Sequence, residues 1–516
     1  MPNIYLGNER LGRPPILIRN VLANFFAQGW MAMLSFLTTP YIVHHLGVDE
    51  YGLLSALLVL LGYFWLFDRC LGLALMRYVS AGNVRADRVW VGRLFQTSLV
   101  VTLAIGMLGV GILFGLSRWF VERVFHIPSN LADVAFQGFL IGAGIFAAKA
   151  LTDPFESLLQ AMQRFDVSNA INVSIFTIQK VLMVVLLMVG FSLSALLDMM
   201  LFLGCVSIGI YAFFSRRIIP DVAFMPRWNG DAFRCLMKFA STAAVGSLMA
   251  MVATGSDKLL LGVMLPIGEL AYYTIAFNLA SVILMIPGNI VSVLFAPFSE
   301  SHAIGEASGM RRFLLGGTRY IMAGVIPPAC LLFVFADQIL VRWMGEAFAA
   351  RSTETLQIFA LAIIPATIGW MSLIAAQATG RPDIPAKIHT LQAVLNVALC
   401  IWLIPLLGIN GAALAWLVNH LVGNLIMVHW VNSRLMNLSS VEFLKEALVK
   451  PVACGLVLLP LALLQRLIST SLPGLILSAA IFLGVSGLAN YAFVLNRGER
   501  LQIRSFLFGL RTPKAA

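Results

Sequence analysis

Hydrophobic residues form long stretches that recur along the whole chain, with short polar gaps between them. Each stretch holds about twenty apolar residues, the length at which an α-helix crosses the hydrocarbon core of a bilayer. No long hydrophilic insertion interrupts the series, so the pattern predicts one membrane domain with about 14 transmembrane helices. We expect the spans to begin near Asn20, Tyr51, Leu94, Ala132, Ser168, Leu193, Leu236, Leu270, Phe313, Thr355, Lys387, Gly411, Ala447 and Leu472.

Composition supports the same class of protein. Of the 516 residues, 60% are hydrophobic and 11% are charged, whereas a globular domain is about 45–50% apolar and about 25% charged. We therefore predict an all-α polytopic membrane protein. The segment 1–19 is polar, so we expect no cleaved signal peptide. Six cysteines fall mostly within spans without the close pairing of a metal site, and we interpret them as packing residues.

The basic residues alternate by side along the predicted spans. Of 35 Lys and Arg residues, six lie within spans, five lie in loops opposite the N-terminus, and the other 24 lie on the N-terminal side. By the positive-inside rule, both termini are expected in the cytoplasm. The net charge of +11 is then a topological signal, and we expect no nucleic acid as a partner.

A weak internal repeat predicts how the spans are grouped. Gly47 and Tyr51 correspond to Gly268 and Tyr272 at one constant offset, which suggests two halves of the same orientation. We expect two six-helix halves, followed by two C-terminal helices. The segments are a cytoplasmic N-terminal segment 1–19, an N-lobe 20–214, a cytoplasmic linker 215–235, a C-lobe 236–432, a helix pair 433–496 and a basic cytoplasmic tail 497–516.

Charged residues within the spans are the candidates for function, because a charge at the bilayer centre costs roughly 2.5–3.5 kcal/mol on insertion scales. Such residues usually face a protein interior or a water-filled cavity. Lys238, Arg319 and Lys149 lie near the cytoplasmic ends of their helices and could instead snorkel to the interface. Lys180 falls close to mid-membrane. The candidates for a cationic cavity lining are Arg69, Lys180, Lys258 and Arg319.

Two acid–base doublets stand out, Asp68 with Arg69 and Asp257 with Lys258. Neighbours along a helix point about 100° apart, so neither doublet is a self-sufficient ion pair. Each acid therefore needs a partner on another helix. Asp68 and Asp257 can neutralise such bases and hold the bundle together.

Uncharged polar residues form stripes at helical spacing on several spans. Asn20, Asn24 and Gln28 form one stripe on the first span, and Asn278 lies on another. Amides also glue membrane helices together, so each stripe can serve packing or binding. Further stripes contain His389, Gln392 and Asn396, or Trp416, His420 and Asn424.

Prolines predict kinks in the later spans. Pro287, Pro297, the pair Pro327 and Pro328, and Pro365 interrupt spans eight, nine and ten. Proline bends a membrane helix by removing a hydrogen-bond donor. Transporters use such bends where one bundle rocks against another.

Several stretches carry a resemblance to a known family. The segment 20–40, "LGVDEYG" at 46–52, the following Asp68, and "LGINGAALAWLV" at 407–418 resemble polysaccharide transporters. These are oligosaccharide flippases of the multidrug/oligosaccharidyl-lipid/polysaccharide (MOP) superfamily, and O-antigen flippases are examples. The resemblance covers roughly residues 18–496. It implies a V-shaped bundle of two six-helix lobes around a central cavity. Such a protein moves a polyprenyl-pyrophosphate-linked oligosaccharide from the inner to the outer leaflet of the bacterial cytoplasmic membrane.

The resemblance also implies partners. These are the lipid-linked glycan, membrane lipid beside the last two helices, and polysaccharide polymerase and assembly proteins. A pyrophosphate needs cationic donors to replace its hydration, which agrees with the basic candidates. We find no Walker-type glycine loop, and we expect no cofactor, no metal site and no catalytic residue.

Two alternatives stay open. A cation-coupled multidrug antiporter of the same superfamily would share the lobes, with acidic cavity groups for cationic drugs. A membrane glycan polymerase or ligase would act on similar substrates, but such enzymes commonly place their chemistry in a sizeable outer loop. The outer gaps here, including the one from Ala336, are short.

Overall fold

The computed structural model shows a helical protein. The residues that it describes are 14–84, 87–125, 127–220, 222–468, 471–495 and 500. Within them, thirteen helical segments are long and apolar enough to cross a membrane, and they coincide with the second to fourteenth expected spans. Helix α1 (Pro14–Leu46) occupies the place of the first. The prediction of an all-α polytopic membrane protein is confirmed.

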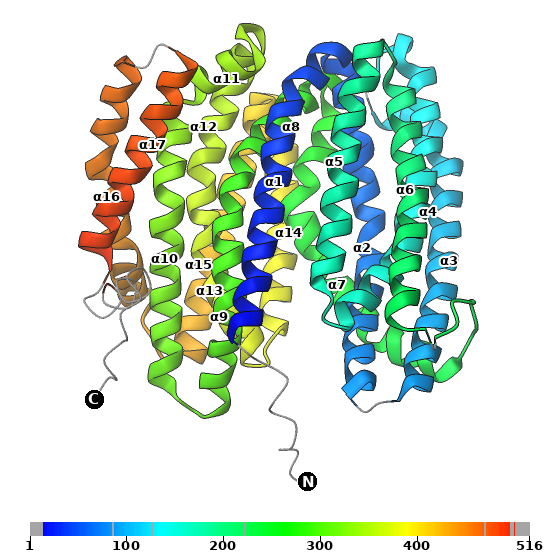
Figure 1. The fold of residues 1–516 in the computed structure, drawn as a ribbon. Helices are drawn as coiled ribbons and strands as arrows, with labels where there is room; N and C mark the ends of the chain where they lie inside the picture. Colours follow the sequence, from blue (N-terminus) through cyan, green and yellow to red (C-terminus); the bar gives the residue numbers. More distant parts are fainter. Residues whose placement is uncertain are drawn as a thin grey trace. The chain divides into compact units, whose positions relative to one another are not determined.

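The chain forms two compact units (Figure 1). The first contains the described residues up to Thr274 together with Asn396–Ile409, and the second contains Ile275–Leu395 and the described residues from Asn410 onward. The expected lobe boundaries stay predictions.

The first unit holds the helices of the N-terminal half. Besides α1, these are α2 (Val48–Val84), α3 (Arg88–Trp119), α4 (Ala132–Ala161), α5 (Phe165–Val189), α6 (Leu193–Ile218) and α7 (Gly230–Met264). Helices α8 (Ile267–Ser281) and α14 (Asp383–Leu407) each have residues in both units.

The second unit holds the remaining helices. These are α9 (Met285–Ala303), α10 (Ala307–Val334), α11 (Ala336–Met344), α12 (Glu346–Ile368), α13 (Trp370–Ala378), α15 (Ile409–Leu435), α16 (Ser440–Ile468) and α17 (Leu472–Ala489).

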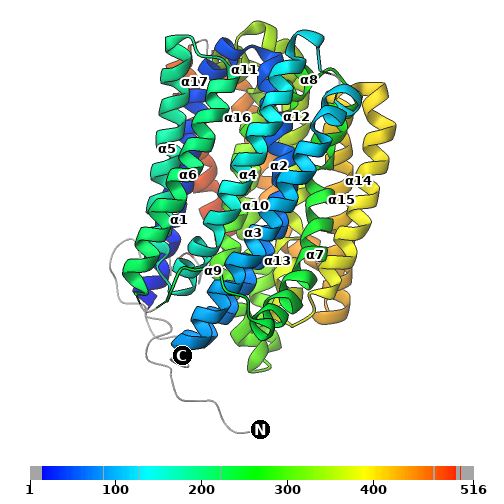
Figure 2. The same ribbon diagram turned by 90° about the vertical axis from the view of Figure 1, so that its right-hand side faces the viewer.

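Helix α2 has a central place in the first unit, because α3, α4 and α7 all pack against it. Helix α5 packs against α1 and α6, and α5 and α6 run side by side (Figure 2). This unit has an apolar core that includes Leu75, Phe95, Leu158 and Leu236, all fully buried. Burial of such side chains fixes the α2–α4 register on which the polar residues described below depend.

Two glycines of "LGVDEYG" have clear structural reasons. Gly47 joins α1 to α2 with a φ of 82°, a left-handed conformation that glycine adopts without steric cost. A Cβ at Gly52 would lie 2.2 Å from the backbone oxygen of Ile267, so glycine lets α2 approach α8 closely. The motif that carried the family resemblance therefore encodes a tight helix junction.

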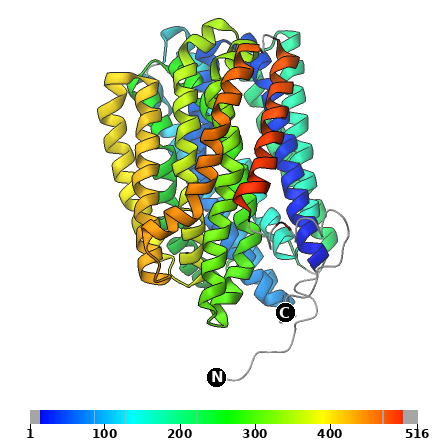
Figure 3. The same cartoon turned by 90° about the vertical axis from the view of Figure 1, so that its left-hand side faces the viewer.

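In the second unit, α16 and α17 form the C-terminal helix pair and pack against α10 (Figure 3). At one end of α16, the Arg466 Nη2 donates to the Asp337 carboxylate at 2.8 Å. At the other end, Arg311 of α10 donates to Glu442. Because both ends of α16 are tied to α10 and its α11 extension, we expect the pair to move with α10.

The expected proline kinks take different forms. The eighth span is interrupted by a 3₁₀ turn at Val282–Leu284, shortly before Pro287. The tenth span divides into α12 and α13 at Gly369. In contrast, α10 continues as one helix through Pro327 and Pro328.

Helix α10 accommodates Pro327 with help from the neighbouring chain segment. Proline has no N–H, so the carbonyl of Ala323, four residues earlier, loses its helical donor. The Asn490 Nδ2, just beyond α17, donates to that carbonyl at 3.0 Å. In a membrane an unsatisfied carbonyl is costly, and Asn490 therefore supports the proline-containing helix.

This arrangement gives a test by double substitution. Asn490→Leu is expected to lower the free energy of unfolding by about 1 kcal/mol, a typical value for a hydrogen bond between membrane helices. Pro327→Ala restores the missing N–H, so the same Asn490→Leu change should cost less in that background. Denaturant titration of the four proteins in detergent measures both values. Equal costs in the two backgrounds would contradict the assignment.

Candidate functional site

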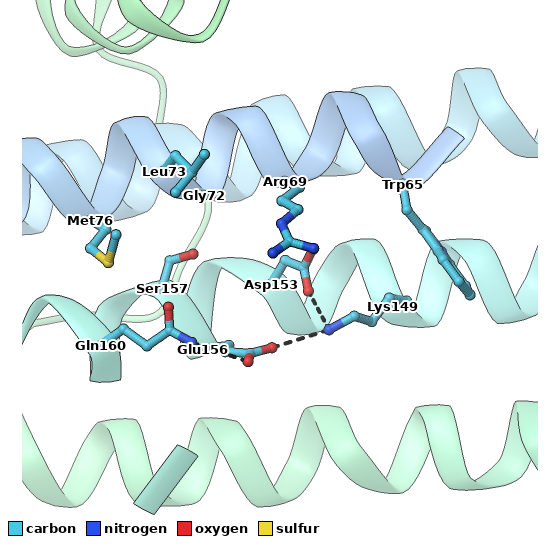
Figure 4. A pocket seen from close by; sticks show the side chains of 10 residues that line it. All are labelled: Trp65, Arg69, Gly72, Leu73, Met76, Lys149, Asp153, Glu156, Ser157 and Gln160. Carbon is cyan, nitrogen blue, oxygen red and sulfur yellow. Dashed lines mark hydrogen bonds and ion pairs between the residues drawn. The ribbon is translucent and has the colours of Figure 1, made fainter. Parts of the chain in front are cut away.

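A polar cavity lies in the first unit, between α2 and α4 (Figure 4). Its volume is about 300 Å³. We call it the α2–α4 pocket. It is lined by Trp65, Arg69, Gly72, Leu73, Met76, Lys149, Asp153, Glu156, Ser157 and Gln160.

Helical spacing places these side chains together. On α4, Lys149, Asp153, Glu156 and Gln160 follow one another at intervals of three or four residues, so they share one face. The α2 residues follow the same spacing. A Cβ at Gly72 would lie 2.6 Å from the Ser157 hydroxyl, so glycine permits the two helices to approach here.

Lys149 is held by two carboxylates of its own helix. Its ammonium lies 2.6 Å from Asp153 and 3.1 Å from Glu156. These two acids are mostly shielded, with 15% and 16% of their side chains exposed, whereas Lys149 is 40% exposed. Lys149 therefore forms ion pairs within the pocket, and the snorkelling interpretation of this residue is not needed.

Glu156 extends the network toward α5 and α6. It accepts hydrogen bonds from Asn172 at 2.9 Å, from Gln160 at 3.2 Å and from Ser168 at 3.4 Å. The Tyr211 hydroxyl in turn donates to Asn172 at 2.9 Å. These donors satisfy a carboxylate that would otherwise be costly inside a membrane-spanning bundle.

Asp68 and Arg69 occupy different environments, as expected for helix neighbours. Asp68 is 1% exposed, accepts from the Thr102 hydroxyl at 3.5 Å and interacts with Asp153. Arg69 is exposed and points from α2 toward Asp153 in the pocket (Figure 4). The doublet thus supplies one buried acid behind the pocket and one accessible base within it.

Lys258 and Asp257 belong to a second buried polar group in the first unit. Asp257 is fully buried and accepts a hydrogen bond from Tyr273, and it attracts the neighbouring Lys258 electrostatically. Close by in sequence, Ser256 accepts from Asn396 at 2.9 Å. This group links α7, α8 and α14.

The other candidates are not in the pocket lining. Lys180 of α5 lies 5.6 Å from the centre of the Phe176 ring. Gln28 of α1 is exposed, and the side chains of Asn20 and Asn24 lie outside the part that the structure describes.

Arg319 and Asn278 belong to the second unit. The Arg319 guanidinium lies 5.9 Å from the centre of the Tyr320 ring, and Asn278 is exposed. Within the described ranges, no group of three or more His, Cys, Asp or Glu side chains could hold a metal ion.

The amide stripes of the second unit serve packing. Gln392 contacts the His389 ring at 2.9 Å and donates to the Asn419 carbonyl at 3.5 Å. Asn424 donates to the Ala366 carbonyl at 3.2 Å, near the α12–α13 break. Such bonds satisfy buried backbone and side-chain groups between membrane helices.

Sequence reasoning missed the acids of the pocket. Asp153 and Glu156 had no place among the candidates, although their spacing from Lys149, four and seven residues, is the signal of a shared helix face. Trp65, in the middle of α2, and Gln160, near the end of α4, carried no comparable signal, because single aromatic and amide residues are common in membrane helices.

Two solved structures share this fold. The lipid II flippase MurJ in an inward closed conformation has a TM-score of 0.71 at 14% identity, over 92% of this chain and 99% of that one. An inward-facing multidrug resistance MATE family transporter of the MOP superfamily has a TM-score of 0.68 at 11% identity, over 78% of this chain and 94% of that one. The fold is therefore that of MOP superfamily transporters.

The family follows from the sequence match. Residues 45–353 match the family model described as "Polysaccharide biosynthesis protein". This is more than half of the chain, so the protein belongs to this family, and the resemblance noted in the sequence is confirmed.

Curated relatives extend over most of the chain. "Uncharacterized membrane protein EpsK" of Bacillus subtilis is 24% identical over 83% of this chain and 85% of its own length. "Putative O-antigen transporter" of Shigella flexneri is 19% identical over 81% and 98%. "Probable flippase AglR" of Haloferax volcanii is 22% identical over 86% and 89%.

Proposed function

We propose that this protein is a flippase that moves a polyprenyl-pyrophosphate-linked oligosaccharide from the inner to the outer leaflet of a bacterial cytoplasmic membrane. The observation that carries the proposal is the α2–α4 pocket, because it places four charged side chains within membrane-spanning helices. Charges inside a span are expensive and usually mark a substrate pathway. Relatives named as an O-antigen transporter and a flippase support the same function.

The proposed mechanism is alternating access between two lobes. The head group enters from the cytoplasm, where both termini would lie, and leaves on the outer side after the lobes rock. A membrane potential that is negative inside favours outward movement of an anion by about 2.3 kcal/mol per charge per 100 mV. Lys180, Lys258 and Arg319 remain candidates for contacts with the pyrophosphate, and Asp68 and Asp257 for coupling to a cation.

Partners complete the proposal. The protein would act as a transporter and not as an enzyme, on a glycan that other membrane proteins assemble. A polysaccharide polymerase on the outer side would consume the product. Membrane lipid beside α16 and α17 would accommodate the polyprenyl tail.

The proposal can be tested in cells that lack both this gene and the downstream polymerase. We expect a lipid-linked oligosaccharide to accumulate where an externally added glycosidase cannot reach it. The wild-type gene should restore access, and Arg69→Gln should lower the rate about tenfold or more through loss of a charge-assisted hydrogen bond. Arg217→Gln, at an exposed position at the end of α6, is the matched control.

Two outcomes would count against the proposal. Access without this protein would show that flipping does not require it. A wild-type transport rate in the Arg69→Gln variant, at equal protein levels, would show that this residue of the pocket is not needed for transport.

A drug antiporter is the second candidate, favoured by the two carboxylates of the pocket. Cationic drugs need acidic partners, but both Asp153 and Glu156 are already paired with Lys149. Efflux of a cationic drug from the deletion strain distinguishes the two functions, because loss of a flippase removes no drug efflux.

A further inference from the structure

The α2–α4 pocket is electrically balanced. Its lining contains two bases, Arg69 and Lys149, and two acids, Asp153 and Glu156. The Lys149 ammonium lies within ion-pair distance of both acids. A pyrophosphate needs an excess of cationic donors to replace its hydration, and this pocket has none to offer.

The same lining suits uncharged hydroxyl groups. A sugar hydroxyl both donates and accepts a hydrogen bond, so it can donate to a carboxylate such as Asp153 and accept from Arg69. Gln160 adds an amide that can do both. Paired charges that remain partly open to the cavity thus offer donors and acceptors close together.

Apolar side chains lie at both ends of the pocket. Trp65 lies at one end, beside Lys149, while Met76 and Gln160 lie at the other (Figure 4). An aromatic side chain presents a large flat apolar face, and the C–H face of a sugar ring is likewise flat and apolar. The volume of about 300 Å³ is at the lower end of small-molecule sites, about 300–1,000 Å³, and suits one ring better than a whole oligosaccharide.

We propose that the α2–α4 pocket binds one neutral sugar ring of the lipid-linked glycan, with Trp65 against the ring face and the charged side chains on its hydroxyls. The pyrophosphate is bound elsewhere. This inference rests on the proposed flippase function and names the part of the substrate that this pocket recognises.

Competition between two lipids tests the inference. The full-length protein in nanodiscs receives equal amounts of a polyprenyl pyrophosphate that carries one neutral hexose and of the same lipid without sugar. Native mass spectrometry separates the two complexes by mass and gives their ratio. We expect the wild type to prefer the sugar-bearing lipid.

Substitution of Trp65 should change the ratio of the two lipid complexes specifically. Trp65→Ala is expected to lower the preference about three- to tenfold, the range for an aromatic contact, while binding of the sugar-free lipid stays the same. Trp65→Phe should retain most of the preference. Trp119→Ala, at a 53% exposed position on α3 outside the pocket lining, is the matched control.

A charged sugar gives an independent test. A lipid that carries one hexuronic acid should compete less well than the hexose lipid, because Asp153 and Glu156 already balance the two bases and leave no spare cation for another carboxylate. An equal or stronger preference for the uronic acid would overturn the assignment of a neutral sugar.

The outcomes separate this inference from the proposed function. If the wild type binds neither lipid, both fail. If it binds both lipids and Trp65→Ala leaves the ratio unchanged, or weakens both lipids equally, the sugar assignment alone is overturned. Melting curves of the variants show whether a loss reflects misfolding, and in that case Trp65→Phe decides the assignment by its ratio.

Discussion

Lys149→Met is expected to lower the free energy of unfolding by about 3 kcal/mol, because removal of one partner leaves buried charges uncompensated. Asp153 and Glu156 lie 2.6 Å and 3.1 Å from the Lys149 ammonium, and both are largely shielded from solvent. Without Lys149, Arg69 is the one base left in the lining for two carboxylates, and the buried Asp68 adds to their repulsion. Denaturant titration in detergent measures the loss, and the glycosidase assay should show no transport.

A triple variant separates the charge effect from the packing effect. Lys149→Met combined with Asp153→Asn and Glu156→Gln removes all three charges, so we expect most of the stability to return. Transport should not return, because the pocket then keeps only Arg69 of its four charged side chains. A Lys149→Met protein as stable as the wild type would show that the ion pairs contribute little to the fold.

The spans could be predicted from sequence because bilayer thickness sets a length that few other structures share. Each expected start near Tyr51, Lys387 or Leu472 has a corresponding helix in the structure: α17 begins at Leu472, while α2 and α14 begin a few residues earlier than expected. Charged and proline residues make the ends of the helices harder to predict. Charged side chains that snorkel, for example, let a helix extend beyond its apolar part.

Only part of the pocket lining could be predicted from the sequence. Arg69 was identified because a charge within a span is rare, and the structure places it in the pocket. Its neighbours on α4 lie about eighty positions further along the chain, and only helix packing decides which face of α4 meets α2. The sequence identifies Lys149 as a basic residue within a span, but the pairing of Lys149 with Asp153 and Glu156 was not predicted.

The amides illustrate a second limit. Asn490 could not be assigned a role from sequence, because its partner is a carbonyl that Pro327 frees on another helix. Gln392 and Asn424 likewise bond to backbone groups of neighbouring helices. These three amides therefore make helix contacts that only the structure shows.

Gly52→Ala is expected to be among the most damaging small changes in the chain. The new Cβ would lie 2.2 Å from the oxygen and 2.9 Å from the carbon of the Ile267 carbonyl. A backbone carbonyl cannot rotate away as a side chain can, so α2 and α8 must separate. We expect the free energy of unfolding to fall by about 3 kcal/mol, the upper end for overpacking.

Gly111→Ala is the matched control, since the same methyl group meets no atom within 4 Å on α3. There alanine only improves helix propensity, so stability should stay equal or rise by up to about 1 kcal/mol. Unfolding in detergent compares the two variants directly. Because α2 also carries Asp68 and Arg69, displacement of this helix at Gly52 should reduce transport as well. A Gly52→Ala protein with wild-type stability and transport would mean that the α2–α8 junction tolerates separation, and that the glycine of "LGVDEYG" serves another purpose.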